Sequence, residues 1–372
     1  MPHSSKTIKQ PAQKLMLLEG FRGLAALLIV AFHATELFSL KFEQPLLFSL
    51  FEFGDSGVDF FFVLSGFFLA VSGFNVLGRQ TAAKDFLLKR CGRIYPLYWL
   101  VSLCIIPIYF LMPSFGKGYE TDIGVIIQSL LLIPQSHPPV LSVAWFLSHL
   151  LFFYLIFTAV ILQPKIFSNV VFAGLSLSAF FIVADVMSGF QLRAKTPFLL
   201  DFIFSYYNLE FAAGCLVGLL FKRIHLKKTW SLFILSMGCL VFMMAALLDV
   251  YVLQTGPNSA GIAYYYHLIA YGASSVLIVG GAAFLEKTHK IQVNKCFLGL
   301  GAASFAIYLT HYPLLSLFTK VIQSTGINGV GFHIVSMTFA CVATVFIGCA
   351  IHVYVEKKLV SLFRKNLTYK RA

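Results

Sequence analysis

The chain has 372 residues, of which 59% are hydrophobic and only 12% are charged. Soluble domains carry about 25% charged residues, so this composition excludes a soluble globular protein. The formal net charge of +13 would suit a nucleic-acid-binding protein as well as a membrane protein, and the positions of the basic residues decide between these two classes.

Apolar runs of about 20 residues are long enough to cross the hydrocarbon core of a bilayer. Ten such runs follow one another along the chain. We therefore predict an all-α, polytopic membrane protein, a bundle of about ten transmembrane helices. The expected spans are 15–37, 56–77, 94–113, 143–162, 167–187, 205–222, 229–250, 263–285, 296–319 and 329–355. A further run at 123–133 is too short to cross, and we expect it to form a re-entrant or interfacial helix.

The distribution of basic residues predicts the orientation of these spans. With the N-terminus inside, 22 of the 28 Lys and Arg residues face the cytoplasm, five lie outside, and Arg22 lies within the first span. Cytoplasmic loops are enriched in Lys and Arg, so we expect both termini in the cytoplasm. The positive charge then reflects topology and attraction to the anionic lipid bilayer, and we expect no nucleic-acid partner.

This topology divides the chain into a cytoplasmic leader at 1–14, a membrane domain at 15–355 and a basic cytoplasmic tail at 356–372. The leader has no short apolar core with a cleavage site, so the first span is expected to be a retained signal-anchor. The seven cysteines lie in or beside the spans without metal-ligand spacing, and we expect no metal. The sequence does not predict the oligomeric state.

The first span carries a stripe of polar residues. Arg22 and His33 are eleven positions apart, which places both side chains on one helical face about 16 Å apart along the axis. Glu19 and Glu36 lie three residues outside this pair and can interact with it on the same face. A charged side chain within a bilayer costs roughly 2.5–3.5 kcal/mol, so this stripe predicts a functional site.

Two further motifs lie at the ends of the second and third spans. Asp59 and Ser65 lie in a segment in which a Gly-Asp turn runs into an aromatic helix. Asp59 is a candidate site residue, and the alternative is an acid in the first helical turn that only satisfies backbone donors. Arg90 and Arg93 share a face at the start of the third span. Guanidinium groups bind phosphate through paired hydrogen bonds, so this pair suits a phosphorylated ligand; the alternative is a positive-inside anchor.

The ninth span contains Ser304, Tyr308 and His311 on one helical face. His311 is a candidate ligand or base, and it is equally a candidate for a satisfied buried hydrogen-bond partner. Weaker candidates, for which the alternative is a cross-link between helices, are Trp145 with His149, Glu210, His267, His352 and Glu356. For Glu356 a solvated side chain is a further alternative.

Four segments in this order resemble the integral-membrane acyltransferase 3 family, bacterial enzymes that O-acylate cell-envelope carbohydrates. They are Glu19-Gly-Phe-Arg22-Gly-Leu-Ala with His33, Gly57-Val58-Asp59-Phe-Phe-Phe-Val-Leu-Ser65-Gly66, Arg90-x-x-Arg93-Ile-Tyr-Pro96, and Ser304-Phe-Ala-Ile-Tyr308-Leu-Thr-His311. The ten-span count also matches, so the resemblance covers nearly the whole chain.

The resemblance implies that the donor is acyl-CoA, and acetyl is the expected acyl group. It implies that the acceptor is a hydroxyl of an extracytoplasmic or lipid-linked carbohydrate. It implies that Arg90, Arg93 and Arg22 bind the phosphates of the donor. His33 would be the catalytic base or acyl carrier, grouped with Arg22 and Glu19. The expected substrate-binding or supporting residues are Asp59, Ser65, Glu36, Tyr308, His311 and Trp145, with Glu36 or Asp59 orienting the His33 ring.

The chain departs from the family pattern at three positions. Glu19 replaces the common aspartate, Leu150 replaces the acid of a Trp-x-Leu-x-x-Glu segment, and no proline follows Glu356. Leu150 removes an expected acceptor contact, and His149 beside it is a candidate substitute. A membrane transporter or exporter of a small molecule or glycan is the main alternative, because buried charges also suit a translocation pathway. A sensor with degenerate catalytic residues is a third alternative.

Overall fold

The computed structural model describes residues 15–43, 48–253 and 262–369. All regular structure in these ranges is helical, and ten helices are long and apolar enough to cross a membrane. The prediction of an all-α bundle with ten such helices is confirmed. The expected leader at 1–14 lies outside the described residues.

The ten candidate spans are built from twelve helices. Their bounds are α1 (Met16–Phe42), α3 (Gly57–Gly73), α4 (Gln80–Leu111), α6 (Trp145–Leu162), α7 (Pro164–Met187), α9 (Phe198–Ile203) with α10 (Tyr207–Arg223), α11 (Lys228–Leu248), α13 (Ala273–Thr288), α14 (Lys295–Ser324) and α15 (Val330–Ile351) with α16 (Lys357–Tyr369). Shorter helices are α2 (Phe48–Phe51), α5 (Ile123–Leu131), α8 (Gln191–Lys195) and α12 (Ile262–Tyr266), and 3-10 turns include Glu52–Ser56 and Ser142–Ala144.

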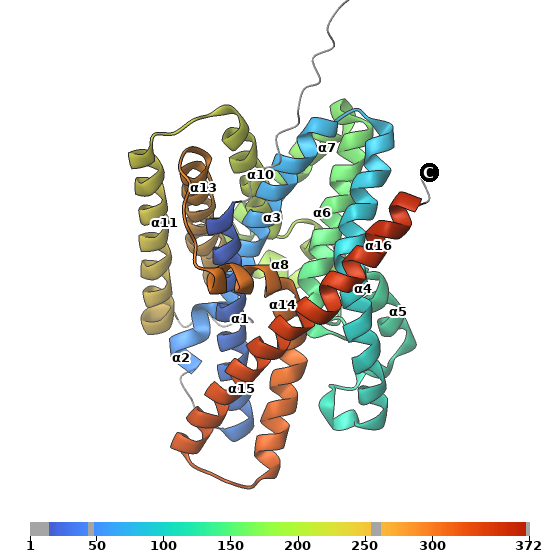
Figure 1. Ribbon diagram of the computed structural model, residues 1–372, viewed down its shortest axis with the longest axis vertical. Helices are drawn as coiled ribbons and strands as arrows, with labels where there is room; N and C mark the ends of the chain where they lie inside the picture. The colour runs from blue at the N-terminus through green and yellow to red at the C-terminus, as the bar shows by residue number, and fades with distance from the viewer. Residues whose placement is uncertain (1–14, 44–47, 254–261, 370–372) are drawn as a thin grey trace, which may run out of the picture.

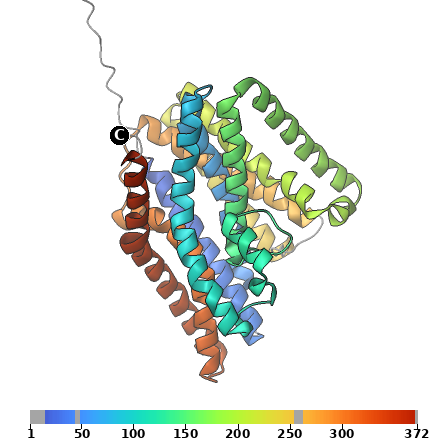
Figure 2. The same cartoon turned by 90° about the vertical axis from the view of Figure 1, so that its right-hand side faces the viewer.

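The arrangement of the helices places α1 near the middle of the bundle. Figure 1 shows α11 and α13 on one side of α1 and α4, α5 and α6 on the other, while α15 crosses the face diagonally toward α16. In Figure 2, the α7 segment stands apart at the edge of the bundle. Only 11% of the residues in the apolar stretch of this helix are buried. The polar stripe of α1 therefore lies in the interior of the protein.

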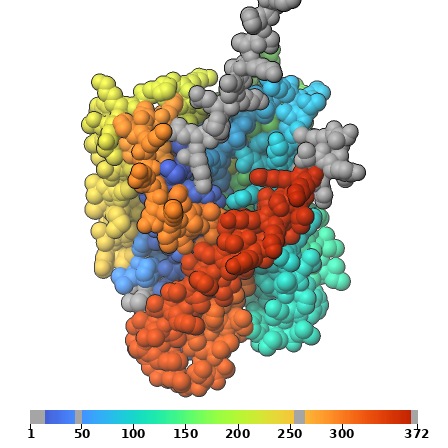
Figure 3. Space-filling model, viewed as in Figure 1, coloured from blue at the N-terminus to red at the C-terminus, as the bar shows by residue number. Residues whose placement is uncertain are grey.

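Two helices extend well beyond the spans that hydropathy predicts. The helix of the third expected span, α4, begins at Gln80 rather than near residue 94. Its first turns form because Ala83 and Phe86 pack against the core, although charged residues surround them in the sequence. The tail expected from residue 356 is helical to Tyr369. Phe363 of this helix packs against Gly92 of α4, and Figure 3 shows this last segment lying across the surface of the bundle. The run at 123–133 forms α5, with one buried side and an exposed one.

Helices α1 and α14 approach each other closely at glycines. A Cβ atom built on Gly23 would lie 2.8 Å from the backbone nitrogen of Gly301, and one built on Gly301 would overlap the carbonyl oxygen of Glu19. Small residues permit this close backbone packing between membrane helices. The contact fixes the polar stripe of α1 against the polar face of α14.

We expect Gly301→Ala to destabilise the protein by about 1–3 kcal/mol, because the added methyl group meets backbone that cannot move aside. Gly299→Ala is the matched control, since a Cβ atom built on Gly299 would have no atom outside its own helix within 4 Å. Thermal unfolding in detergent should show a lower midpoint for the first variant alone. Equal midpoints for both variants would contradict the close approach.

Three π-helical segments interrupt the long helices, at Asp249–Leu253, His267–Gly272 and His352–Glu356. Such segments are uncommon and frequently occur at functional sites. Each begins or ends on a buried ionisable residue, namely Asp249, His267 and the pair His352 and Glu356. The locally widened helices therefore coincide with buried polar groups.

Candidate active site

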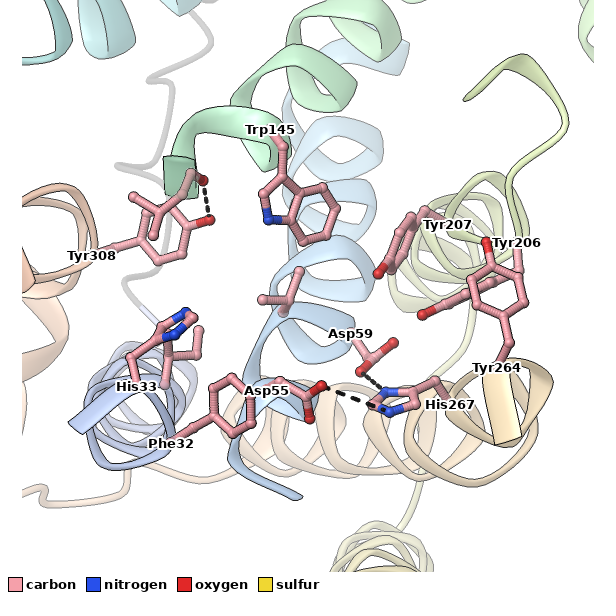
Figure 4. Close-up of a pocket in the computed structure, with 13 residues that line it drawn as sticks. Phe32, His33, Asp55, Asp59, Trp145, Tyr206, Tyr207, Tyr264, His267 and Tyr308 are labelled. Carbon is pink, nitrogen blue, oxygen red and sulfur yellow. Dashed lines mark hydrogen bonds and ion pairs between the residues drawn. The ribbon is translucent and has the colours of Figure 1, made fainter. Parts of the chain in front are cut away.

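A cavity of about 200 Å³ lies between α1, the Glu52–Ser56 turn, α3 and the helices around them. Figure 4 shows His33 on one side of this space and Asp59, His267 and Tyr207 on the other, with Trp145 at the edge between the two sides. The cavity residues are Ile29, Phe32, His33, Asp55, Val58, Asp59, Val143, Trp145, Tyr206, Tyr207, Tyr264, His267 and Tyr308.

His33 is held by a carboxylate one helical turn away. Its Nδ1 donates to Glu36 Oε2 at 2.9 Å, and both side chains are about three-quarters buried. Because a carboxylate only accepts, this bond places the proton of the neutral imidazole on Nδ1. Nε2 then carries the lone pair, and it has no protein partner among the described residues. His33 is therefore oriented as a base or nucleophile.

The polar face of α14 completes this side of the cavity. The His311 ring lies 5.2 Å from the His33 ring, and the Tyr312 ring lies 5.1 Å from it. His311 is fully buried and its Nδ1 donates to the Tyr308 carbonyl at 2.6 Å. The Tyr308 hydroxyl donates to the Val143 carbonyl at 2.6 Å, which ties α14 to the start of α6.

A second histidine lies on the opposite side of the cavity. His267 Nδ1 donates to Asp59 Oδ2 at 3.1 Å, and its Nε2 lies 3.8 Å from Asp55 Oδ2. Glu210 is 1% exposed and interacts electrostatically with Asp59 from behind. We name Asp55, Asp59 and His267 the carboxylate wall. Asp59 therefore binds His267 rather than His33, and of the two residues expected to orient His33 only Glu36 contacts it.

An aromatic layer separates this cavity from the other end of the polar stripe. The rings of Phe61, Phe146 and Tyr308 lie 5.7–6.1 Å from one another. Ser304 lies one turn of α14 before Tyr308, on the far side of this layer. A ligand that reaches from Ser304 to His33 must displace or pass these rings.

Arg22 begins a cluster of three arginines beyond that layer. It donates to Ser304 Oγ at 3.1 Å and to Glu19 Oε1 at 3.4 Å. Arg90 donates to Ser72 at 2.8 Å, with its guanidinium 5.3 Å from the centre of the Tyr154 ring. Arg93 joins the cluster because, like Arg22 and Arg90, it interacts electrostatically with Tyr154. Two helices distant in sequence, α1 and α4, thus bring their arginines to one cationic site around Tyr154 of α6.

A buried acid supports this arginine cluster. Glu356 is 1% exposed, with Oε1 3.5 Å from Arg93 Nη2 and Oε2 accepting from His352 Nδ1 at 2.7 Å. The alternative of a solvated Glu356 is wrong, because the π-segment turns its side chain into the bundle. The tail helix is thereby joined to Arg93.

The structure sorts the expected site residues into two groups. His33, Asp59, Trp145 and Tyr308 line the cavity, with Glu36 and His311 directly behind His33. Arg22, which we grouped both with His33 and with Arg90 and Arg93, lies in the arginine cluster, and Glu19 lies there beside it rather than with His33. Ser65 is half-buried on α3 and does not line the cavity.

The structure also shows the surroundings of Leu150, which stands where the family pattern has an acid. Leu150 packs in the apolar core, and His149 packs its ring 4.0 Å from the Phe202 ring without lining the cavity. His149 therefore does not substitute for the acid in the cavity. The carboxylates that do line it are Asp55 from the Glu52–Ser56 turn and Asp59 from the first turn of α3.

Four polar residues of the cavity were not among the candidate residues: Asp55, Tyr206, Tyr207 and Tyr264. The signals were a second aspartate four residues before Asp59 and clusters of tyrosine at the ends of two spans. His267 was only a weak candidate because its carboxylate partners lie about 200 residues away in the sequence. Among the described residues, no group of His, Cys, Asp or Glu is arranged to hold a metal ion.

The chain is similar in sequence to known proteins. The exopolysaccharide production protein ExoZ of Rhizobium meliloti (strain 1021) is 26% identical over 320 residues, which cover 83% of this chain and 90% of that protein. Protein 2 in the picA locus of Rhizobium radiobacter is 38% identical over 104 residues, 28% of this chain and 49% of that protein. No solved structure matches.

The family model described as an acyltransferase domain matches residues 17–353. This match runs from the first membrane helix into the last, through both the cavity and the arginine cluster. The chain is therefore a multi-pass membrane protein of the acyltransferase 3 family.

Proposed function

We propose that this protein transfers an acyl group, acetyl being the expected one, from cytoplasmic acyl-CoA to a carbohydrate hydroxyl on the outer side of the bacterial inner membrane. The observation that carries the proposal is the division of one polar stripe into an arginine cluster and a cavity containing an oriented histidine. The name of one relative, an exopolysaccharide production protein, supports an extracellular polysaccharide as the acceptor.

The arginine cluster suits the phosphates of coenzyme A. Arg22, Arg90 and Arg93 carry three positive charges, whereas the acids paired with them are Glu19 and Glu356. Phosphate oxygens accept strong charge-assisted hydrogen bonds from guanidinium groups. The excess positive charge therefore favours a polyanionic donor over a neutral ligand.

The spacing along α1 suits the length of such a donor. His33 lies eleven residues beyond Arg22, about 16 Å along the helix. The pantetheine arm of a donor held by the arginines would extend past the aromatic layer toward His33. Only the acyl group then needs to reach the acceptor, so neither coenzyme A nor the carbohydrate crosses the membrane.

The chemistry at His33 follows from its free Nε2. As a base, Nε2 takes the proton of the acceptor hydroxyl while the hydroxyl oxygen attacks the thioester carbonyl. The carbon–sulfur bond breaks, an ester forms, and the proton passes to the leaving thiolate. As an acyl carrier, Nε2 attacks the thioester carbonyl first, the carbon–sulfur bond breaks and the thiolate of coenzyme A leaves. The acceptor oxygen then attacks the acyl-imidazole, the carbon–nitrogen bond breaks, and the hydroxyl proton passes to the thiolate. Glu36 stabilises the positive charge on the ring in both routes.

Incubation of the purified protein with labelled acetyl-CoA tests the proposal. We expect acylation of an added polysaccharide acceptor with release of coenzyme A, and inhibition by excess free coenzyme A, which competes for the arginine cluster. Mass spectrometry distinguishes the two routes, because only the acyl-carrier route leaves an adduct on His33. Carbohydrate flux across proteoliposomes without any acyl transfer would contradict the proposal and support a transporter.

A further inference from the structure

We propose that the carboxylate wall and the aromatic rings beside it form a subsite for one uncharged sugar ring, and that this subsite rejects acidic sugars. This inference rests on the proposed function, because it defines which acceptor hydroxyls His33 can reach. It assigns a ligand class to the side of the cavity opposite His33, which the catalytic step itself does not use.

The first observation is an unpartnered oxygen atom of the wall. The Asp55 side chain lines the cavity and is 19% exposed, and its Oδ1 atom has no hydrogen-bond partner among the described residues. The Asp59 side chain is 2% exposed and shares a hydrogen bond with the buried Glu210. Carboxylate oxygens accept hydrogen bonds, and buried acceptors are normally satisfied. Asp55 therefore suits a ligand that brings a hydroxyl donor.

The second observation is the aromatic surface next to these oxygens. The Trp145 and Tyr207 rings lie 5.3 Å apart and both line the cavity. Figure 4 shows Trp145 at the edge of the space between His33 and the carboxylate wall, and Tyr207 on the same side as the wall, with Tyr206 and Tyr264 beyond it. A sugar ring has an apolar C–H face and a rim of hydroxyls. Aromatic rings beside a few fixed polar groups match both features.

The third observation concerns charge. No Lys or Arg is among the described residues that line the cavity. His267 lies between Asp55 and Asp59 and already contacts both carboxylates. An acidic sugar would bring another negative charge next to these carboxylates without a counter-ion, and like charges across an interface disfavour binding. The subsite should therefore discriminate against carboxylated and phosphorylated sugars.

The size of the cavity limits the ligand to about one ring. Pockets for drug-sized ligands measure roughly 300–1,000 Å³, whereas this cavity measures about 200 Å³. A single sugar unit held between Trp145 and the wall lies across from His33, which places one of its hydroxyls toward Nε2. The rest of a longer acceptor must remain outside the cavity.

The test measures sugar binding without any acyl donor. In the full-length protein carrying Trp99→Phe and Trp230→Phe, Trp145 is the remaining tryptophan and reports on the cavity. We expect methyl β-D-glucoside to change its fluorescence at concentrations at least tenfold lower than methyl β-D-glucuronide, which differs by one carboxylate. Equal affinities, or no binding of either sugar, would overturn the proposal.

Asp55→Asn identifies the wall as the origin of the preference. The amide has nearly the same shape and no charge, so we expect the glucoside-to-glucuronide preference to fall about tenfold. Asp201→Asn is the matched control, because Asp201 pairs with Arg193 and does not line the cavity. A preference unchanged in Asp55→Asn would overturn the assignment to the wall.

Tyr207→Leu provides a second, uncharged test that does not depend on Asp55. It should weaken binding of the glucoside about tenfold by removing one aromatic face, and an unchanged affinity would count against the subsite. Acetyl-CoA turnover is measured separately on the same preparations. Failure of turnover in the wild-type protein would overturn the proposed function, whereas the sugar-binding results decide the subsite.

Discussion

His33→Ala should lower acyl transfer by at least about 100-fold while leaving the protein folded in the membrane. Loss of a general acid or base typically costs about 10²–10⁴ in rate, and loss of an acyl carrier would abolish the covalent route entirely. The reason lies in the geometry, since Nε2 of His33 is the unpaired nitrogen of an imidazole that lines the cavity. Release of coenzyme A from labelled acetyl-CoA measures the effect.

Glu36→Gln is expected to have a smaller effect in the same assay. The amide can still hold the His33 ring through its carbonyl oxygen, but it no longer stabilises the charge that develops on the ring during the reaction. We expect a loss of about tenfold in kcat with little change in the KM for acetyl-CoA. Rates equal to wild type would show that Glu36 only packs against His33.

His225→Ala is the matched control for both variants, because His225 is exposed in the loop between α10 and α11. Size-exclusion profiles and thermal midpoints of all three variants should match those of the wild type. Wild-type turnover in His33→Ala would remove His33 from the mechanism, and the remaining candidate in the cavity would be His267.

Much of the fold and one side of the site follow from helical periodicity. Arg22 and His33 share a face because they are eleven residues apart, and Ser304, Tyr308 and His311 share a face for the same reason. The structure brings these two faces together: Ser304 bonds Arg22, and His311 lies beside His33. Patterns within one helix therefore predicted these residues well.

The opposite side of the cavity depends on contacts between distant segments, which periodicity does not report. His267 meets Asp59 across 208 residues of sequence. The π-segments add to this difficulty, because one extra residue per turn rotates the following side chains away from the face that an ideal α-helix predicts. Glu356 is the clearest case, since a basic tail sequence follows it and yet its side chain is buried.

The two ends of the site differ in charge in a way that matches two different ligands. The arginine cluster has more cations than acids, whereas the described residues that line the cavity include two carboxylates and no Lys or Arg. A polyanion is favoured at the first end and disfavoured at the second. Binding a donor and an acceptor in the reversed positions is thus opposed electrostatically.

Arg93→Ala should raise the KM for acetyl-CoA about 10- to 100-fold with a much smaller change in kcat. Hydrogen bonds to charged groups contribute about 1.5–3 kcal/mol, and each 1.4 kcal/mol corresponds to about a tenfold change in affinity. Arg93 is positioned for this role because Glu356 holds it from the buried side while its own side chain remains 42% exposed. Initial rates at varied acetyl-CoA concentrations separate the two parameters.

A truncated donor identifies the group that Arg93 binds. If Arg93 binds the 3′-phosphate of coenzyme A, acetyl-dephospho-CoA should be a poor donor for the wild type. The Arg93→Ala variant should then use acetyl-CoA and acetyl-dephospho-CoA equally well, because the substitution and the missing phosphate remove the same contact. Arg79→Ala is the charge-matched control, because Arg79 is exposed before α4 and outside the arginine cluster. If Arg93→Ala raised only the KM for the carbohydrate, the donor assignment would be refuted, because the arginine cluster would then contact the acceptor.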